Sequence, residues 1–489
     1  MWCQPASYTF APTELVLASV SLPVTSRSNN AVSISLDPDV RLSYARDASG
    51  LEMIPEAVAR PSEVSEVAAL LREATALRTP VTAAGAQSST TAASITNSGL
   101  LLSLRGLAHM HEVDTDTRTI RVGAGALVAD VRRAAESAGL LFTPDPTSEE
   151  ECTIGGAIAC NASGARSLRY GATGPHVRAL TVLLADGSLL DVRRPALEKN
   201  TVGYPIAHDP VDWFVGSEGT LGIVVEAELA LQALPTQVLG LAIPFMSEED
   251  ALAFVVAARQ SPNVYPRCLE YFDALAFTIA RDADGSPTWA PDARAMVYVE
   301  ETGADESRSD DELPLDAWLA LSELYRALIG DIRVYDAPAS LRDVRRLRHA
   351  VPATMNERGA AFRAAGGRKV STDWAVPYPR LAEALRMARG IASAHGIPQA
   401  VAYGHAGNGH PHQNFIARDV AELHRIEAVV EATLREVLSM GGTVAAEHGI
   451  GKLKRRWLPM QASPVQLRVM RAIKQEFDPL GLLAPGNVL

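Results

Sequence analysis

Residues 152–164 read Cys-Thr-Ile-Gly-Gly-Ala-Ile-Ala-Cys-Asn-Ala-Ser-Gly, and this stretch decides how the rest of the chain is interpreted. Apolar residues suited to a core are interrupted here by the pair Gly155-Gly156. Glycine has no Cβ atom, so paired glycines in an apolar segment indicate that another backbone or a planar ligand comes close. The stretch therefore predicts a close approach without saying what approaches.

Two loops of related composition lie on either side of this stretch. Residues 84–90 read Ala-Gly-Ala-Gln-Ser-Ser-Thr and follow a predicted strand, while residues 216–222 read Gly-Ser-Glu-Gly-Thr-Leu-Gly and precede another. Small residues and hydroxyl groups are typical of a backbone that approaches a phosphate. A plain Gly/Ser turn would explain one such loop. Three on one folding unit favour a large, extended cofactor that carries a diphosphate.

A Rossmann dinucleotide fold is the alternative raised by Gly123-Ala124-Gly125. These residues follow a predicted strand and precede a helix over Val128–Ala138. However, Val128 takes the third glycine position, and no acidic residue ends a strand about twenty positions further on. Because both parts of the fingerprint are missing, we set this interpretation aside.

Length, charge and cysteine content indicate a globular protein with a small ligand. The chain has 489 residues, a net charge of -12 and no basic block, which argues against nucleic acid and anionic membranes as main partners. Cys3, Cys152, Cys160 and Cys268 are too dispersed for a disulfide framework or an iron–sulfur domain. The apolar run Leu15–Val24 is too short to span a bilayer. We expect a cytoplasmic protein without a transmembrane segment, and association with a membrane surface stays open.

Imidazole groups are concentrated in residues 403–414, which read Tyr-Gly-His-Ala-Gly-Asn-Gly-His-Pro-His-Gln-Asn. This stretch holds three of the eleven histidines among glycines and a proline, a composition that cannot sustain a helix. Glu447 and His448 add a carboxylate and another imidazole further along. The set indicates a metal site or proton transfer, and a polar turn whose histidines face water is the alternative.

The spacing of these histidines leaves two pairings open. His405 and His412 are seven residues apart and would face opposite sides of one continuous strand, so this pair requires the loop to fold back. His410 and His412 are two residues apart and would share one face of a strand.

Several motifs in the same order resemble a known family. The loops around Gly85, Gly155-Gly156 and Gly219 resemble the FAD-binding domain of the vanillyl-alcohol oxidase superfamily. The histidine stretch and Glu447-His448-Gly449, together with Phe477-Asp478-Pro479, resemble its D-lactate, D-2-hydroxyglutarate and glycolate dehydrogenase branch. The resemblance runs from about residue 50 to the end of the chain, too far to attribute to chance.

The resemblance implies an α+β fold in which a split FAD-binding domain of two α/β subdomains receives an inserted cap with an antiparallel sheet. We expect four segments. They are an N-terminal lead-in over residues 1–49, the FAD-binding domain over 50–237, the substrate-binding cap over 238–439, and a return to the FAD-binding domain over 440–489.

Local patterns agree with a new domain after Leu234-Pro235, where the glycine-rich loops stop. A helix over Glu248–Arg259 and an amphipathic helix over Leu381–Ala394 are predicted there, and a strand over Gln399–Tyr403 leads into the histidine stretch. We expect the acidic run Glu300–Glu312 to be a solvated loop of the cap.

The resemblance also implies which residues hold cofactors. FAD is expected on Gly85, Ala86, Gln87, Ser88, Ser89, Thr153, Gly155, Gly156, Asn161, Gly164, Glu218, Gly219, Gly222 and Ile223. Some relatives attach FAD covalently through a histidine of the first loop. Residues 82–95 contain no histidine, so we expect noncovalent FAD. The implied ligands of a divalent metal, zinc or manganese, are His405, His412 and Glu447.

The implied reaction is oxidation of a D-2-hydroxy acid of the lactate, glycolate or 2-hydroxyglutarate type to the 2-oxo acid, with hydride transfer to flavin N5. His448 is expected to take the hydroxyl proton, and Arg348 and Lys369 to bind the substrate carboxylate. A surface charge is the alternative for each of the two cations. Neighbouring arginines, among them Arg346, also leave the register of Arg348 open.

The sequence departs from the family pattern in three places. Ala84 and Gln87 stand where many relatives have Arg and Gly, Asn408 and His410 replace an Asp and an Asn, and Ala484 replaces an Asn.

Two other functions stay open. A transferase of the ether-lipid synthase type would use FAD without net redox change, and a flavin subunit of a larger complex would have no turnover of its own. The Glu447-His448 pair argues against the second. The sequence does not identify the electron acceptor, and it leaves open whether the chain forms a homodimer.

Overall fold

The computed structural model describes residues 33–303 and 313–489. The apolar run Leu15–Val24 and most of the expected lead-in over residues 1–49 lie outside the described residues, so the predictions made for them are unchanged. Within the described ranges, no helix is both long and apolar enough to cross a membrane.

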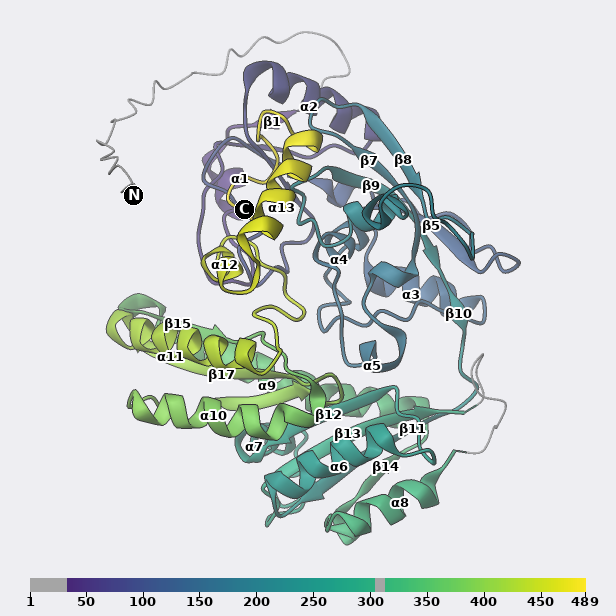
Figure 1. Cartoon of the computed structure of the whole chain (residues 1–489), viewed down its shortest axis with the longest axis vertical. Coiled ribbons are helices and arrows are strands. Elements are labelled where there is room, and N and C mark those ends of the chain that lie inside the picture. Colours follow the sequence, from purple (N-terminus) through teal and green to yellow (C-terminus); the bar gives the residue numbers. More distant parts are fainter. Residues whose placement is uncertain (1–32, 304–312) are drawn as a thin grey trace, which may run out of the picture. The chain divides into compact units, whose positions relative to one another are not determined.

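Two four-stranded sheets are built from the first half of the described chain (Figure 1). In the first, β2 and β3 both run parallel to β4, and helix α2 connects β2 to β3. In the second, all neighbouring strands are antiparallel. The first sheet comprises β1 (Ile34–Ser35), β2 (Ala57–Ala59), β4 (Leu100–Ser103) and β3 (Val81–Ala84) in that order. The second comprises β5 (Thr119–Gly123), β9 (Ile223–Ala230), β7 (Val177–Leu183) and β8 (Leu189–Arg193).

Helix α2 (Val64–Leu77) shows how local sequence sets these elements. The side chain of Glu66 accepts the backbone N–H groups of Ser62 at 2.8 Å and Glu63 at 3.1 Å, which would otherwise have no partner at the helix start. The helix buries one face at i, i+3, i+4 and i+7 spacing against the first sheet, as an amphipathic helix does. Its buried residues are Val67, Ala68, Leu70, Leu71 and Ala74.

A seven-stranded antiparallel sheet dominates the segment that follows β10 (Gln232–Ala233). Its strands, in order across the sheet, are β14 (Arg333–Tyr335), β11 (Val238–Phe245), β13 (Ala295–Thr302), β12 (Cys268–Asp273), β16 (Val401–His405), β17 (His410–Asp419) and β15 (Gly366–Ser371). Every neighbouring pair is antiparallel.

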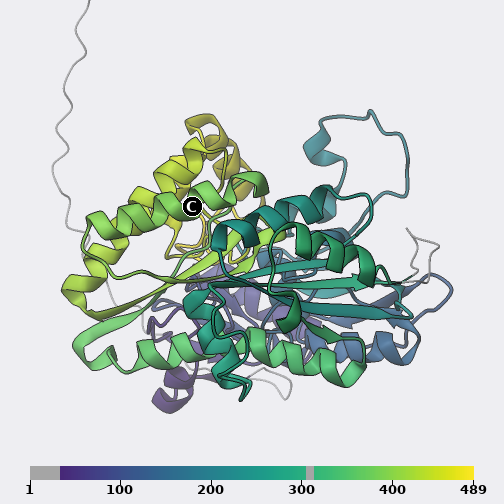
Figure 2. The same cartoon turned by 90° about the horizontal axis from the view of Figure 1, so that it is seen from below.

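Helices pack on both faces of this sheet (Figure 2). Strand residues alternate between the faces: Leu241 and Ile243 belong to one core cluster, and Ala242 between them belongs to the other. Helices α6 (Glu248–Gln260), α8 (Leu315–Leu324), α10 (Leu381–Ala394) and α11 (Val420–Ser439) pack in the first cluster. Helices α7 (Ala274–Ala283) and α9 (Pro338–Ala360) pack in the second.

The C-terminal segment returns to the first two sheets. The backbone of Val81 in β3 donates to the carbonyl of Leu482 at 2.8 Å and accepts from the N–H of Ala484 at 2.7 Å. At the end of helix α13 (Pro464–Phe477), the ring of Phe477 lies 5.4 Å from that of Phe214. The described residues form one compact unit by their contacts, so the domain boundaries at residues 237 and 439 stay predictions.

The expectation that Glu300–Glu312 is a solvated loop is wrong at its start. Glu300 and Glu301 lie in β13 and are buried. Glu300 accepts a hydrogen bond from Arg166 at 3.0 Å and another from Arg267 at 2.8 Å. A run of charges in the sequence does not reveal arginines that fold against it, and these two pair with a carboxylate that would otherwise be too costly to bury. Residues 304–312 lie outside the described residues.

Candidate active site

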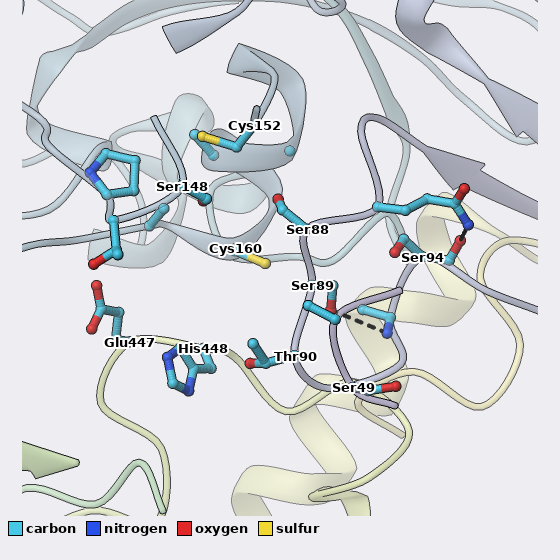
Figure 3. A pocket seen from close by; sticks show the side chains of 18 of the residues that line it. Ser49, Ser88, Ser89, Thr90, Ser94, Ser148, Cys152, Cys160, Glu447 and His448 are labelled. Atoms are coloured by element: carbon cyan, nitrogen blue, oxygen red, sulfur yellow. Dashed lines mark hydrogen bonds between the residues drawn. The ribbon is translucent and has the colours of Figure 1, made fainter. Parts of the chain in front are cut away.

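A cavity of about 980 Å³ is lined by the glycine-rich loops and by members of the histidine cluster (Figure 3). This cluster consists of His405, His410, His412, Glu447 and His448 together with the charged residues around them. All the residues expected to hold FAD line it except Asn161 and Gly164. His405, His412, Glu447, His448, Arg348 and Lys369 line it as well. The structure therefore brings the predicted FAD loops together with the predicted metal ligands and catalytic residues.

Asn161 and Gly164 support the loop from outside this lining. Asn161 ends helix α4 (Ile154–Cys160) with a left-handed backbone, φ 50°, and its side-chain oxygen accepts the N–H of Gly174 at 2.8 Å. A Cβ atom at Gly164 would lie 2.1 Å from the carbonyl oxygen of Asp145, so only glycine fits. Both residues shape the backbone around the cavity.

The three glycine-rich loops contact one another and the segment that carries Glu447. A Cβ atom at Gly85 would lie 2.3 Å from the hydroxyl oxygen of Thr153, so the first two loops touch there. Glu218 in the third loop accepts the backbone N–H groups of Ile450 and Gly451 at 2.6 Å each. Burial raises the pKa of Glu218, and these two hydrogen bonds oppose that rise.

A hairpin delivers the three histidines. Strands β16 and β17 are joined by a short turn over Ala406–Asn408, and the register pairs His405 with His410 and Tyr403 with His412. The chain thus folds back, as the pairing of His405 with His412 requires. The ring of His412 lies 5.3 Å from that of His405 and 4.5 Å from that of His410, so both pairings left open by the spacing occur together.

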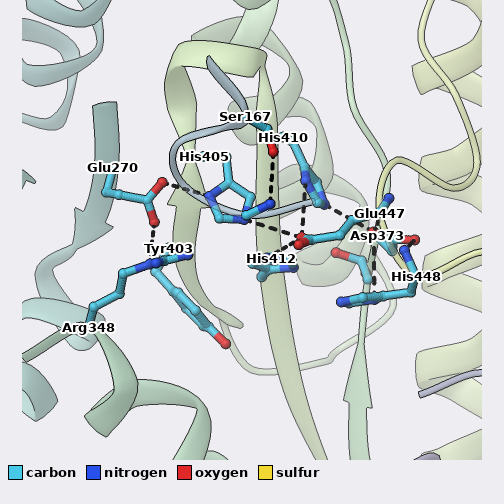
Figure 4. Close-up of polar contacts among 12 residues, drawn as sticks. Ser167, Glu270, Arg348, Asp373, Tyr403, His405, His410, His412, Glu447 and His448 are labelled. Atoms are coloured by element: carbon cyan, nitrogen blue, oxygen red, sulfur yellow. Dashed lines mark hydrogen bonds and ion pairs between the residues drawn. The ribbon is translucent and has the colours of Figure 1, made fainter. Parts of the chain in front are cut away.

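Glu447 meets all three imidazoles (Figure 4). Its Oε2 lies 3.2 Å from His405 Nε2, 3.6 Å from His412 Nε2 and 3.9 Å from His410 Nδ1. One ligand atom from each of the four residues lies within 4.8 Å of the others. Burial alone would raise the pKa of Glu447, but His405 lowers it to about 2. The carboxylate is therefore ionised and available to a cation.

Glu270 orients His405 from the side opposite Glu447. His405 Nδ1 lies 2.6 Å from Glu270 Oε1, and Arg348 donates to Glu270 Oε2 at 2.8 Å. Burial would lower the pKa of His405, but the carboxylates of Glu270 and Glu447 raise it to about 10. A bound cation would replace that proton between His405 Nε2 and Glu447.

Asp373, just after β15, holds the segment that carries Glu447 and His448. It accepts their backbone N–H groups at 3.1 Å and 3.0 Å and forms an ion pair with Lys454. Burial would raise the pKa of Asp373, but His448 and Lys454 hold it well below its usual range. A charged side chain this deeply buried needs such compensation.

No sequence motif indicated a role for Glu270 or Asp373. A weak signal was present for Glu270, because it stands between the apolar residues Leu269 and Tyr271 of the strand Cys268–Asp273, and a carboxylate at such a position must find a partner if the strand is buried. No spacing rule names that partner.

His448 lies flat against His412, with ring centroids 5.4 Å apart and an angle of 14° between the planes. Its Nδ1 is 3.6 Å from Asp373 Oδ1. Burial lowers the pKa of His448, and the negative charge of Asp373 offsets part of this decrease. The imidazole is therefore neutral near pH 7 and able to accept a proton.

Lys369 and Arg348 differ in their surroundings. Burial lowers the pKa of Lys369, in β15, to about 8, and its ammonium group forms no ion pair with any side chain that the structure describes. The guanidinium of Arg348, in α9, is already paired with Glu270. Of the two cations expected to meet the substrate carboxylate, Lys369 is the one without a carboxylate partner in the described structure.

Comparison with known proteins gives two matches that together cover most of the chain. Residues 55–193 match the FAD binding domain, and residues 234–488 match the family described as FAD linked oxidases, C-terminal domain. The chain belongs to the FAD-linked oxidases. The predicted α+β fold class with an FAD-binding domain, the FAD cofactor and the enzyme class are confirmed.

Among the relatives, a D-lactate dehydrogenase of Archaeoglobus fulgidus is 32% identical over 88% of this chain and 91% of its own length. The glycolate oxidase subunit GlcD of Bacillus subtilis is 30% identical over 92% of both chains. A D-2-hydroxyglutarate dehydrogenase of Xanthomonas citri pv. viticola is 32% identical over 89% of both chains. The branch that the motifs resembled is thereby confirmed.

A solved structure of an alkyldihydroxyacetonephosphate synthase superposes with a TM-score of 0.69. It covers 92% of this chain and 82% of its own at 17% sequence identity. At this identity the likeness concerns the fold alone.

Proposed function

We propose that this enzyme oxidises a D-2-hydroxy acid to the 2-oxo acid, using noncovalent FAD and a divalent metal, zinc or manganese, held by His405, His412 and Glu447. The observation that carries the proposal is a single cavity lined by the FAD loops, these three residues, His448 and Lys369. The named relatives act on lactate, glycolate and 2-hydroxyglutarate, which are all 2-hydroxy acids.

The residues that line the cavity fit both FAD and a divalent metal. Gly85, Gly155 and Gly219 line the cavity with backbone alone, and backbone N–H groups and nearby hydroxyls of such loops can face a diphosphate. Buried imidazoles beside an ionised carboxylate are the donors that zinc and manganese accept. When bound, FAD takes up a hydride, and the metal lowers the pKa of a hydroxyl group that it contacts.

His448 is proposed to remove the hydroxyl proton at Nε2. Its other nitrogen, Nδ1, faces Asp373, which stabilises the imidazolium once the proton has been taken up. Stacking on His412 fixes the ring beside the ligand set. Loss of the hydroxyl proton makes the hydride at C2 a better leaving group, so proton and hydride transfer support each other.

Lys369 is proposed to bind the substrate carboxylate. In a 2-hydroxy acid this group is one carbon from the hydroxyl, so a cation on the same cavity as His448 can hold both ends of the reacting unit. Arg348 supports the site chiefly through Glu270, which keeps His405 Nε2 directed at Glu447. Arg348 also lines the cavity, and we propose that N–H groups it does not give to Glu270 assist Lys369.

Anaerobic mixing with D- and L-2-hydroxy acids tests this function. The oxidised flavin absorbance should bleach with a D-2-hydroxy acid when metal is present, and the matching 2-oxo acid should appear. A transferase of the ether-lipid synthase type would leave the flavin oxidised after the same mixing. A flavin that no D-2-hydroxy acid bleaches, in protein loaded with FAD and zinc or manganese, would refute the proposal.

A further inference from the structure

His410 is the third imidazole of the cluster, and the proposed function gives it no role. It begins β17, is 4% exposed, and pairs with His405 across the hairpin. Its Nε2 forms no hydrogen bond with any described residue, although it lies 3.1 Å from Asp373 Oδ1. The contact with Asp373 accounts for the position of Nε2, and it leaves Nδ1, the nitrogen that faces Glu447, without a role.

The two nitrogens of His410 are placed like those of His405. His405 has Nδ1 beside the carboxylate of Glu270 and Nε2 beside Glu447. His410 has Nε2 beside the carboxylate of Asp373 and Nδ1 beside Glu447. Histidines that bind metals usually have an outer carboxylate on one nitrogen and the metal on the other. By this comparison His410 has the surroundings of a ligand.

The distances between the donor atoms also fit a ligand role for His410. Two atoms bound to one ion at about 2.1 Å each lie at most about 4.2 Å apart. Nδ1 of His410 is 3.9 Å from Glu447 Oε2, inside that limit. The four donor atoms lie within 4.8 Å of one another, so a contraction of about 0.6 Å would bring them all around one ion.

We propose that His410 binds the metal through Nδ1 as a fourth protein ligand beside His405, His412 and Glu447. This inference rests on the metal site of the proposed function and extends it. The donor set becomes three imidazoles and one carboxylate, which prefers zinc, cobalt or nickel to magnesium or calcium. Asp373 then serves both ends of the site, since it orients His410 and holds the segment of Glu447 and His448.

Metal titration of FAD-loaded protein tests the assignment. Apoprotein of the wild type and of His410→Asn is titrated with Zn²⁺ against a chromophoric chelator. Because loss of an outer partner of a ligand already costs about 10–100-fold in affinity, removal of the ligand itself should weaken Zn²⁺ binding by about 100-fold or more. His424→Asn, an exposed histidine of α11, is the matched control and should bind Zn²⁺ like the wild type.

A second measurement needs no variant. Pulsed EPR of the wild-type protein loaded with Cu²⁺ counts the imidazoles coupled to the ion, and three are expected. Two coupled imidazoles, or equal Zn²⁺ affinity in the wild type and His410→Asn, would overturn the role of His410 and leave the proposed function intact. A wild-type protein that binds none of these ions would instead overturn the metal of the proposed function, and this inference with it.

Discussion

The glycine-rich loops and the histidine cluster line one cavity but are built in opposite ways. Each loop is a short continuous segment, such as residues 84–90, that contributes backbone and small polar side chains. The cluster gathers long side chains from β12, α9, β15, β16, β17 and the segment after α11. One region depends on the absence of side chains, and the other depends on several charged side chains holding one another in place.

This difference predicts how each region responds to change. In the cluster, Glu270, Asp373 and Glu447 are compensated by Arg348, Lys454 and the histidines. Removing one member leaves another charge buried without compensation, which is more costly than losing a surface ion pair. In the loops, a substitution is harmful because the added atoms collide with neighbouring atoms. Where the added atoms fit, we expect no effect.

Metal removal should have the largest effect and separate the two regions most clearly. Chelator treatment should slow flavin reduction by the hydroxy acid by about 10³-fold, because metal stabilisation of the developing alkoxide is worth several kcal/mol. The flavin spectrum should persist, since the proposed ligands lie outside the glycine-rich loops. Stopped-flow reduction with the metal content checked by mass spectrometry measures both. Full activity in verified metal-free protein would remove the metal from the mechanism.

His448→Asn should have the next largest effect. A positioned general base contributes about 10²–10⁴-fold, so the reduction step should slow by at least about 100-fold while FAD and metal stay bound. Anaerobic stopped-flow measurements beside metal analysis give the answer. If His448 only packs against His412, the variant will instead lose metal or stability, with a near-normal reduction rate in the fraction that retains metal.

Lys369→Met should weaken substrate binding by about 10–100-fold with a smaller effect on the reduction step, because a hydrogen bond to a charged group contributes about 1.5–3 kcal/mol. Burial sets the pKa of Lys369 at about 8, so the ammonium is charged below that pH and loses its charge above it. The wild-type KM should therefore be flat below pH 8 and rise above it, and the variant should lack this rise.

Lys199→Met, at an exposed lysine, is the matched control for Lys369→Met and should keep the wild-type KM at each pH. A Lys369→Met variant whose KM equals that of the wild type below pH 8 would show that another group holds the carboxylate.

Gly85→Ala should have the smallest effect and confine it to the loops. The added Cβ atom would lie 2.3 Å from Thr153 Oγ1, and overpacking of this kind costs about 1–3 kcal/mol. FAD affinity, measured by fluorescence titration of the apoprotein, should fall by about tenfold, while Zn²⁺ affinity stays unchanged. Gly390→Ala, where a Cβ atom meets open space, should alter neither. Equal losses of FAD and Zn²⁺ affinity would contradict the independence of the two regions.

Sequence alone could identify the parts of the site that are local. The loops around Gly85, Gly155 and Gly219 could be found because glycine in an apolar context marks a close backbone approach wherever it occurs. The histidines at 405 and 412 could be found because the turn that joins them lies in the same short stretch. Both signals are complete within about fifteen residues or fewer, the distance over which pattern reasoning applies.

Tertiary structure alone decided which charges meet. Glu270 is 135 residues from His405, and Asp373 is 81 residues from Lys454, yet each pair is in direct contact. The tertiary structure also buries Glu300, which the local run of charges had predicted to be exposed to solvent. The reason is physical: a side chain's charge is a property of the residue, but the partner that makes its burial tolerable is set by which strands the sheet brings side by side.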